Sequence, residues 1–182
     1  MTLKHLTLGT ALALGLAAPA CHATLAVGAD APDFSADAAL GGQPMRFSLA
    51  AALKKGPVVL YFYPKAFTSG CTVEAHQFAE ASDKFGALGA TVIGVSNDDV
   101  ATLKKFSVEA CRNKFAVAAD DGAKVIKAYD AALTLMPNTA DRVSYVISPQ
   151  GKILSVYQSM SPEGHVETTL KAVERWRTAA RP

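Results

Sequence analysis

One stretch in the first half of the chain constrains the fold most, because it reads as a buried strand that turns into a helix. The apolar run 58–63 has proline on both sides, which is typical of a strand buried on both faces. Small and apolar residues then recur at helical spacing over 71–85. Thr68 or Ser69 is expected to cap this helix with its side chain, which puts Cys71 in the first turn. Free N–H groups and the helix dipole favour a thiolate there, so the stretch predicts a reactive sulfur.

The same residues carry a family resemblance. Pro64, Thr68 and Cys71 form the pattern Pro-x-x-x-Thr-x-x-Cys, which resembles the active-site signature of the peroxiredoxins. The wider run 58–75 is similar to the peroxiredoxin-Q, or bacterioferritin-comigratory, branch, and the resemblance extends over about 27–176. It implies a thiol-dependent peroxidase that reduces hydrogen peroxide and alkyl hydroperoxides in antioxidant defence and redox homeostasis.

The rest of the chain predicts an α/β protein. Strand and helix patterns alternate until two final strands pair through a tight turn at 148–151, which favours a mixed sheet with helices on both faces. We therefore expect a thioredoxin-like fold, without a dinucleotide site, because no glycine-rich fingerprint follows a strand. The predicted elements are an extended arm at 27–34, strands at 44–49, 90–96, 115–119, 142–148 and 152–158, helices at 49–55, 97–110, 123–129 and 163–177, and a polar loop at 136–138.

The resemblance assigns roles to the residues around the sulfur. Cys71 is the peroxidatic nucleophile, and Arg142 is the cation that holds the thiolate and the leaving oxygen. Thr68 bonds the peroxide or the sulfur, Pro64 shields the sulfur from water, and Glu74 supports Arg142. Each residue also has an ordinary structural explanation: a helix cap for Thr68, a strand end for Pro64, a solvated strand start for Arg142 and a first-turn acid for Glu74.

A second cysteine is needed if the oxidised Cys71 is resolved within the chain. His76 occupies the place, five residues after Cys71, where many relatives carry that cysteine, and helix geometry turns its side chain away. Cys111 is then the predicted resolving cysteine, with a Cys71–Cys111 disulfide as the expected product. The alternatives are an idle buried thiol at Cys111 and a one-cysteine peroxidase reduced by an external thiol.

The first 23 residues read as a secretory signal peptide, because the apolar run 6–18 is too short to cross a bilayer. Cleavage is expected after Ala23 or Ala20, and a lipoprotein with Cys21 as the lipidated residue is a minor alternative. The expected organisation is a signal peptide at 1–23 and a peroxiredoxin domain at 24–182, located in the periplasm or otherwise exported. The partners would be a hydroperoxide and a thioredoxin-like reductant, and the protein would be a monomer or a dimer without a membrane span.

Charge, histidine spacing and cysteine spacing argue against several other functions. A net charge of +2 with interspersed charges gives no basis for nucleic-acid binding. His76 and His165 have no ligand partners at metal spacing, so neither metal nor cofactor is expected. A thiol–disulfide oxidoreductase would need cysteine where Thr68 stands. An exported redox sensor or holdase, and a purely structural domain, remain as alternatives.

Overall fold

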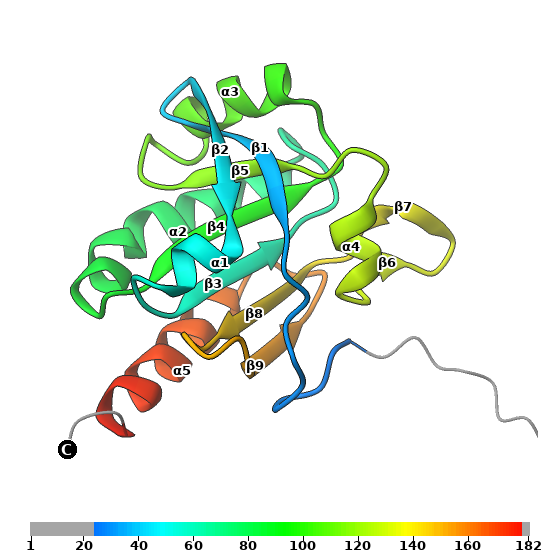
Figure 1. Ribbon diagram of the computed structural model, residues 1–182. Helices are drawn as coiled ribbons and strands as arrows, with labels where there is room; N and C mark the ends of the chain where they lie inside the picture. Colours follow the sequence, from blue (N-terminus) through cyan, green and yellow to red (C-terminus); the bar gives the residue numbers. More distant parts are fainter. Residues whose placement is uncertain (1–23, 180–182) are drawn as a thin grey trace, which may run out of the picture.

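The computed structural model describes residues 24–179, and the predicted leader at 1–23 lies outside them. A seven-stranded sheet has the order β2-β1-β5-β4-β3-β8-β9, and helices cover both of its faces (Figure 1). The fold is therefore the expected thioredoxin-like α/β architecture. The elements are β1 (Ser35–Leu40), β2 (Gln43–Ser48), α1 (Leu49–Leu53), β3 (Val58–Phe62), α2 (Ser69–Ala87), β4 (Thr91–Ser96), α3 (Val100–Glu109), β5 (Ala116–Ala119), α4 (Lys124–Ala128), β6 (Ala132–Leu133), β7 (Met136–Ala140), β8 (Val143–Ile147), β9 (Ile153–Gln158) and α5 (His165–Ala179).

The central strand β3 divides the core into two layers because its side chains alternate between the faces of the sheet. Leu60 and Phe62 join the cluster that includes α1 and α4, whereas Val59 and Tyr61 join the cluster that includes α2, α3 and α5. Every residue of β3 is buried, as the continuous apolar run predicts for a strand covered on both faces.

Strand directions explain how distant parts of the chain meet. Strands β3, β4 and β5 are parallel, so the loops after them lie at one edge of the sheet. Strand β8 is antiparallel to β3 and pairs Val143 with Phe62. The residue that enters β8, Arg142, is therefore delivered to the same edge as the loop that follows β3.

Two parts of the predicted secondary structure are wrong. Residues 35–40, for which no strand was predicted, form β1, which lies between β2 and β5 inside the sheet. The predicted polar loop at 136–138 belongs to β7, which pairs with β6 in a separate two-stranded hairpin. Strand β1 is poor in β-branched residues, having the sequence SADAAL, and β7 is mostly exposed, so neither has a strong strand signal.

The predicted turn at 148–151 agrees better with the structure. Gly151 N donates to Ser148 O at 2.8 Å in the β8–β9 turn, and Asp99 caps α3 by accepting from Thr102 N at 2.7 Å. Within residues 24–179, none of the helices combines the length and hydropathy that a bilayer-spanning segment needs.

Candidate active site

Cys71 is the third residue of α2, directly beyond the carboxyl end of β3. Its side chain is almost fully buried, with 1% exposure, and its thiol is free. The first intrahelical bond runs from Thr72 N to Thr68 O at 2.9 Å, so the N–H groups before residue 72 are unpaired by the helix. The sulfur therefore lies beside the electropositive end of a 19-residue helix.

The loop that carries Cys71 is held by the neighbouring strand. Asp98, just after β4, accepts from Ala66 N and from Ser96 Oγ, both at 2.8 Å, and lies 3.6 Å from Lys65 Nζ. Phe67 has a φ of 65°, in the left-handed region, where the chain turns into α2. Asp98 therefore anchors the loop to the sheet.

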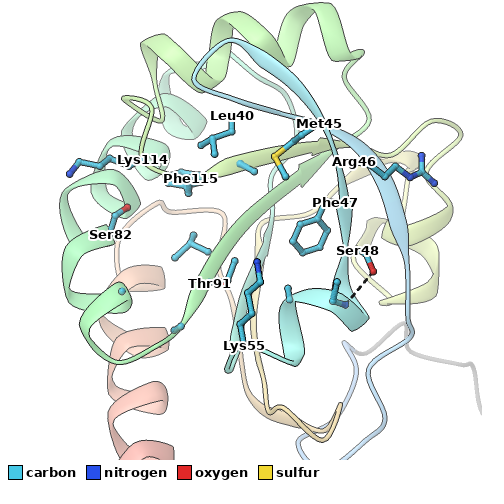
Figure 2. A pocket seen from close by; sticks show the side chains of 16 residues that line it. Leu40, Met45, Arg46, Phe47, Ser48, Lys55, Ser82, Thr91, Lys114 and Phe115 are labelled. Carbon is cyan, nitrogen blue, oxygen red and sulfur yellow. Dashed lines mark hydrogen bonds between the residues drawn. The ribbon is translucent and has the colours of Figure 1, made fainter.

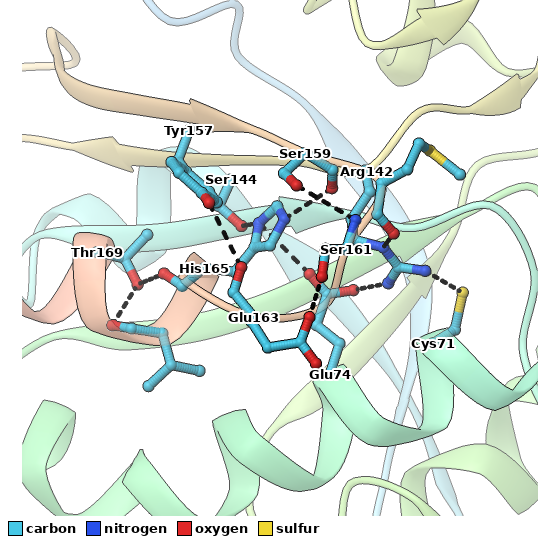
Figure 3. Close-up of polar contacts among 12 residues, drawn as sticks. Cys71, Glu74, Arg142, Ser144, Tyr157, Ser159, Ser161, Glu163, His165 and Thr169 are labelled. Atoms are coloured by element: carbon cyan, nitrogen blue, oxygen red, sulfur yellow. Dashed lines mark hydrogen bonds and ion pairs between the residues drawn. The ribbon is translucent and has the colours of Figure 1, made fainter.

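Arg142 lies against the sulfur. Its Nη2 is 3.5 Å from Cys71 Sγ, its Nε donates to Met160 O at 3.0 Å, and its Nη1 donates to Glu74 (Figure 3). Cys71 and Glu74 are one turn apart on α2, so the planar guanidinium can contact both at once. Gly70 leaves the space for this arrangement, because a Cβ added there would lie 3.0 Å from Arg142 Nη2.

Burial sets the electrostatics of this cluster. Arg142 is 3% exposed and Glu74 is fully buried. Desolvation raises the pKa of Glu74 to about 8, and the Arg142 guanidinium opposes that rise without cancelling it. Burial works against the charge of Arg142, but Glu74 and Cys71 outweigh it and raise the pKa of the guanidinium, so Arg142 remains a fixed cation.

His165, the first residue of α5, is a further buried member of the cluster that the sequence reasoning missed. Its Nδ1 is 2.8 Å from Ser144 Oγ and 3.5 Å from Glu74 Oε1, and its Nε2 is 3.0 Å from Ser159 O (Figure 3). Burial lowers the pKa of His165, so the ring is neutral. The available signal was Gly164-His165 at the start of an amphipathic helix, which by itself does not distinguish this position from an exposed one.

Two other predicted site residues, Pro64 and Thr68, lie on the loop that precedes Cys71. Pro64 is half-buried directly after Tyr63, and Thr68 is exposed at the N-cap position of α2. The expected side-chain cap is wrong, because Thr68 Oγ1 donates to Lys65 O at 3.0 Å instead of accepting from the helix. The hydroxyl is thereby held by the loop, since its proton is used by that carbonyl.

Cys111 lies just after α3 and is completely buried, in the same core cluster as Cys71. Both thiols are free, so the structure contains no disulfide between them. Desolvation strongly raises the pKa of Cys111, which keeps it a thiol in this conformation. His76 is half-buried on α2, and the hydrogen bonds that Arg142 makes to Met160, Glu74 and Cys71 do not involve it.

A cavity of about 390 Å³ lies elsewhere, at the opposite edge of the sheet where β4 and β5 begin. Figure 2 shows Met45, Phe47 and Lys55 around it. Its lining within residues 24–179 includes no cysteine, histidine or carboxylate, so it does not supply the groups needed for thiol chemistry. No set of three potential ligands close enough to bind a metal ion occurs in that described range.

A thioredoxin-like sheet with a buried cysteine at a helix start, beside an arginine, defines the class of thiol-bearing thioredoxin-like proteins. Solved structures agree with that class. The crystal structure of peroxidoxin BcpB from Mycobacterium tuberculosis matches with a TM-score of 0.72 and 31% identity, over 86% of this chain and 98% of that chain. Mycobacterium tuberculosis AhpC matches with a TM-score of 0.75 over 88% of this chain and 97% of that chain, and at 20% identity it shows the fold alone.

The family model described as AhpC/TSA matches residues 27–156. This chain belongs to the AhpC/TSA family, the peroxiredoxins. Chloroplastic peroxiredoxin Q of Triticum aestivum is 38% identical over 122 residues, which are 66% of this chain and 56% of the relative. The Arabidopsis thaliana peroxiredoxin Q is 37% identical over 114 residues, 62% of this chain and 52% of the relative. The chain thus spans little more than half the length of these curated relatives.

The predicted periplasmic location is wrong by this comparison. The curated relatives are named chloroplastic, which is an organellar location, and none of them supports an exported protein. The predicted signal peptide, with its cleavage after Ala20 or Ala23 and the lipid site at Cys21, falls outside the described residues. The location was inferred from a short apolar run followed by a few small residues. This pattern does not by itself establish where a protein is located.

Proposed function

We propose that the protein is a thiol-dependent peroxidase acting on hydrogen peroxide and alkyl hydroperoxides, with Cys71 as the peroxidatic cysteine. The observation that carries this proposal is the position of Arg142 Nη2, 3.5 Å from the buried Cys71 Sγ. A fixed cation at that distance stabilises the thiolate and can also stabilise charge on a departing oxygen. Membership of the AhpC/TSA family also supports a thiol-dependent peroxidase.

The proposed first step is a displacement at oxygen. The Cys71 thiolate attacks one peroxide oxygen, an S–O bond forms and the O–O bond breaks. The electron pair leaves with the second oxygen as hydroxide or alkoxide, which takes a proton from water. The sulfur becomes a sulfenic acid, and Arg142 holds the leaving oxygen while Pro64 and the Thr68 loop limit the access of water.

The second step needs a thiol, and we assign it to Cys111. Once exposed, the Cys111 thiol would lose its proton to solvent, and its thiolate would attack the Cys71 sulfenic sulfur. The S–S bond forms as the S–O bond breaks, and the hydroxide that leaves takes up a proton from solvent to become water. A thioredoxin-like dithiol would then reduce that disulfide. Because the Cys111 thiol is buried and its pKa is raised by burial, the end of α3 must open before this attack.

The burial of Cys111 also favours a second candidate, a one-cysteine peroxidase whose sulfenic acid is reduced directly by an external thiol. Mapping the cysteines by mass spectrometry after one equivalent of peroxide separates the two. Cys71→Ser should abolish turnover, and Cys111→Ser should keep the first oxidation but lose the intramolecular disulfide. Absence of that disulfide in the unmodified protein would favour the one-cysteine enzyme.

A redox sensor or holdase would use the same sulfur without turnover. Rapid, repeated consumption of hydrogen peroxide with a dithiol reductant distinguishes the peroxidase from it, because a sensor stops after one oxidation. A monomer or dimer is retained as the proposed assembly, with light scattering as its test. One structural neighbour, Plasmodium yoelii Prx1a modified at its N-terminus, forms an artifactual octamer.

A further inference from the structure

One carboxylate oxygen in the cluster lacks a hydrogen-bond partner. Glu74 Oε2 accepts from Arg142 Nη1, but Glu74 Oε1 is buried without a hydrogen bond among the described residues. His165 Nδ1 lies 3.5 Å from this oxygen. A buried oxygen without a donor is costly, so the state of these two groups needs an explanation.

The contacts of His165 determine which of its nitrogens carries a proton. Nε2 lies 3.0 Å from Ser159 O, a carbonyl that can only accept, so Nε2 carries hydrogen and donates. In the neutral ring Nδ1 then carries a single lone pair, which faces both Ser144 Oγ at 2.8 Å and Glu74 Oε1 at 3.5 Å, so a proton on Glu74 would share this acceptor with the Ser144 hydroxyl. A charged Glu74 would therefore point Oε1 at another lone pair, whereas one proton on either atom turns this repulsion into attraction.

The charge balance of the cluster leads to the same conclusion. An ionised Cys71 and an ionised Glu74 would place two negative charges on the single guanidinium of Arg142, with all three groups buried. If Glu74 carries a proton, Cys71 and Arg142 form one balanced pair. Buried charges are tolerated when they are paired, so the protonated carboxyl favours the thiolate.

We propose that Glu74 and His165 hold one buried proton between them, mainly on Glu74, and that this proton leaves the positive charge of Arg142 to the Cys71 thiolate. Both are positioning residues, since neither contacts the sulfur. The predicted effect on rate rests on the proposed peroxidase function, whereas the protonation itself does not.

The direction of the pKa shifts supports this assignment of the proton. Burial raises the pKa of Glu74 to about 8 and lowers that of His165, so the acid holds the proton below about pH 8 and loses it above. Loss of the proton makes Glu74 compete for Arg142, and the rate with peroxide should fall. Among residues 24–179, the other titratable or charged groups that face the pair are Cys71 on α2, Arg142 and Asp141 before β8, Tyr157 on β9 and Tyr61 on β3.

The kinetic test is the pH profile of the second-order rate of Cys71 oxidation by hydrogen peroxide. The unmodified protein should show a falling limb near pH 8, and Glu74→Gln, which cannot ionise, should lack it. His165→Leu removes the acceptor of the Glu74 proton, so the limb should move about one pH unit lower, the equivalent of one hydrogen bond. His165→Asn, which can place an amide oxygen near the Nδ1 position, should restore most of that shift.

An infrared difference spectrum between the unmodified protein and Glu74→Gln at pH 7 tests the proton without any activity. The proposal expects the carbonyl band of a protonated carboxylic acid in this difference spectrum. The matched control is the difference spectrum between the unmodified protein and Glu80→Gln, which should lack the band because the exposed Glu80 carboxylate pairs with Arg112 on the surface. An ionised Glu74 at pH 7, or an alkaline limb unmoved in His165→Leu, would overturn the proposal. If the band is present while Cys71 does not react with peroxide, the inference stands and the proposed function fails.

Discussion

Among single side chains, Arg142 is the residue on which the proposed chemistry depends. Its Nε, Nη1 and Nη2 donate to Met160 O, Glu74 and Cys71 Sγ. The guanidinium thus joins the loop before α5 to two successive turns of α2. A lysine would offer a point charge on a flexible stem and could not hold all three contacts in one plane. The position of the cation is therefore as important as its charge.

Arg142→Lys tests this geometry. We expect the rate of Cys71 oxidation by hydrogen peroxide to fall about 100-fold, the magnitude found when one preorganised donor is removed from an oxyanion site. The matched control is Arg46→Lys, because Arg46 is 62% exposed and pairs with Asp37 at 2.8 Å on the surface. A rate for Arg142→Lys within twofold of that control would contradict the role given to Arg142.

Cys71, Arg142 and the support of Arg142 by Glu74 were predicted from the pattern and the family resemblance. The contact of Glu74 with His165 was not predicted, because the two resemble a first-turn acid and an ordinary helix-start histidine. Their roles depend on the pairing of β8 with β3 and on the packing of α5 against α2, and these contacts span up to 91 positions (165 − 74). Local periodicity carries no information at that separation.

At the scale of elements, the start of α2 determines whether the sulfur and the guanidinium can meet. Gly70 and Gly86 lie on the same helix but have different surroundings. An added Cβ would lie 3.0 Å from Arg142 Nη2 at Gly70, and would have nothing within 4 Å at Gly86. The two glycines therefore separate a local packing effect from a general effect on helix propensity.

Gly70→Ala should displace the Arg142 guanidinium and lower the rate with peroxide by roughly 10- to 100-fold, since a misplacement of about 1 Å can have that effect. Gly86→Ala should leave the rate unchanged and raise the free energy of unfolding by about 0.4–1 kcal/mol. Stopped-flow kinetics and urea unfolding of both variants measure these effects. Equal rates for the two variants would show that Gly70 does not make room for Arg142.

The predicted elements are most accurate where burial and periodicity agree. The central strand, its helix α2 and the β8–β9 hairpin were expected from apolar runs and turn residues, and the structure has them within a few residues. Strand β1, with the sequence SADAAL, is held between β2 and β5 by backbone pairing and small side chains. Tertiary context, which no local pattern reveals, makes that segment a strand.

For the molecule as a whole, the proposed cycle requires a change of conformation. Cys71 and Cys111 both contribute to the cluster that packs α2, α3 and α5 on the sheet, so a disulfide between them removes two buried members of that core. The residues after Cys111 already adopt left-handed backbone conformations, with φ of 51° at Arg112 and 59° at Asn113. We expect opening to begin at this end of α3.

Hydrogen exchange measures that opening. In the oxidised protein, the amides at the start of α2 and the end of α3 should exchange at least about tenfold faster than in the reduced protein, because local unfolding exposes their hydrogen bonds. Strand β3, in the centre of the sheet, should be unchanged. Identical protection in both states would indicate that Cys111 does not join the cycle, and the Cys111→Ser variant provides the matched control.

The most direct test of the account is the reaction of the reduced Cys111→Ser variant with one equivalent of hydrogen peroxide, followed by rapid mixing and mass mapping of Cys71. The account predicts the gain of one oxygen on Cys71, at least about 10³-fold faster than on free cysteine, because a fixed cation and orientation both contribute. A Cys71 that reacts no faster than free cysteine would contradict it.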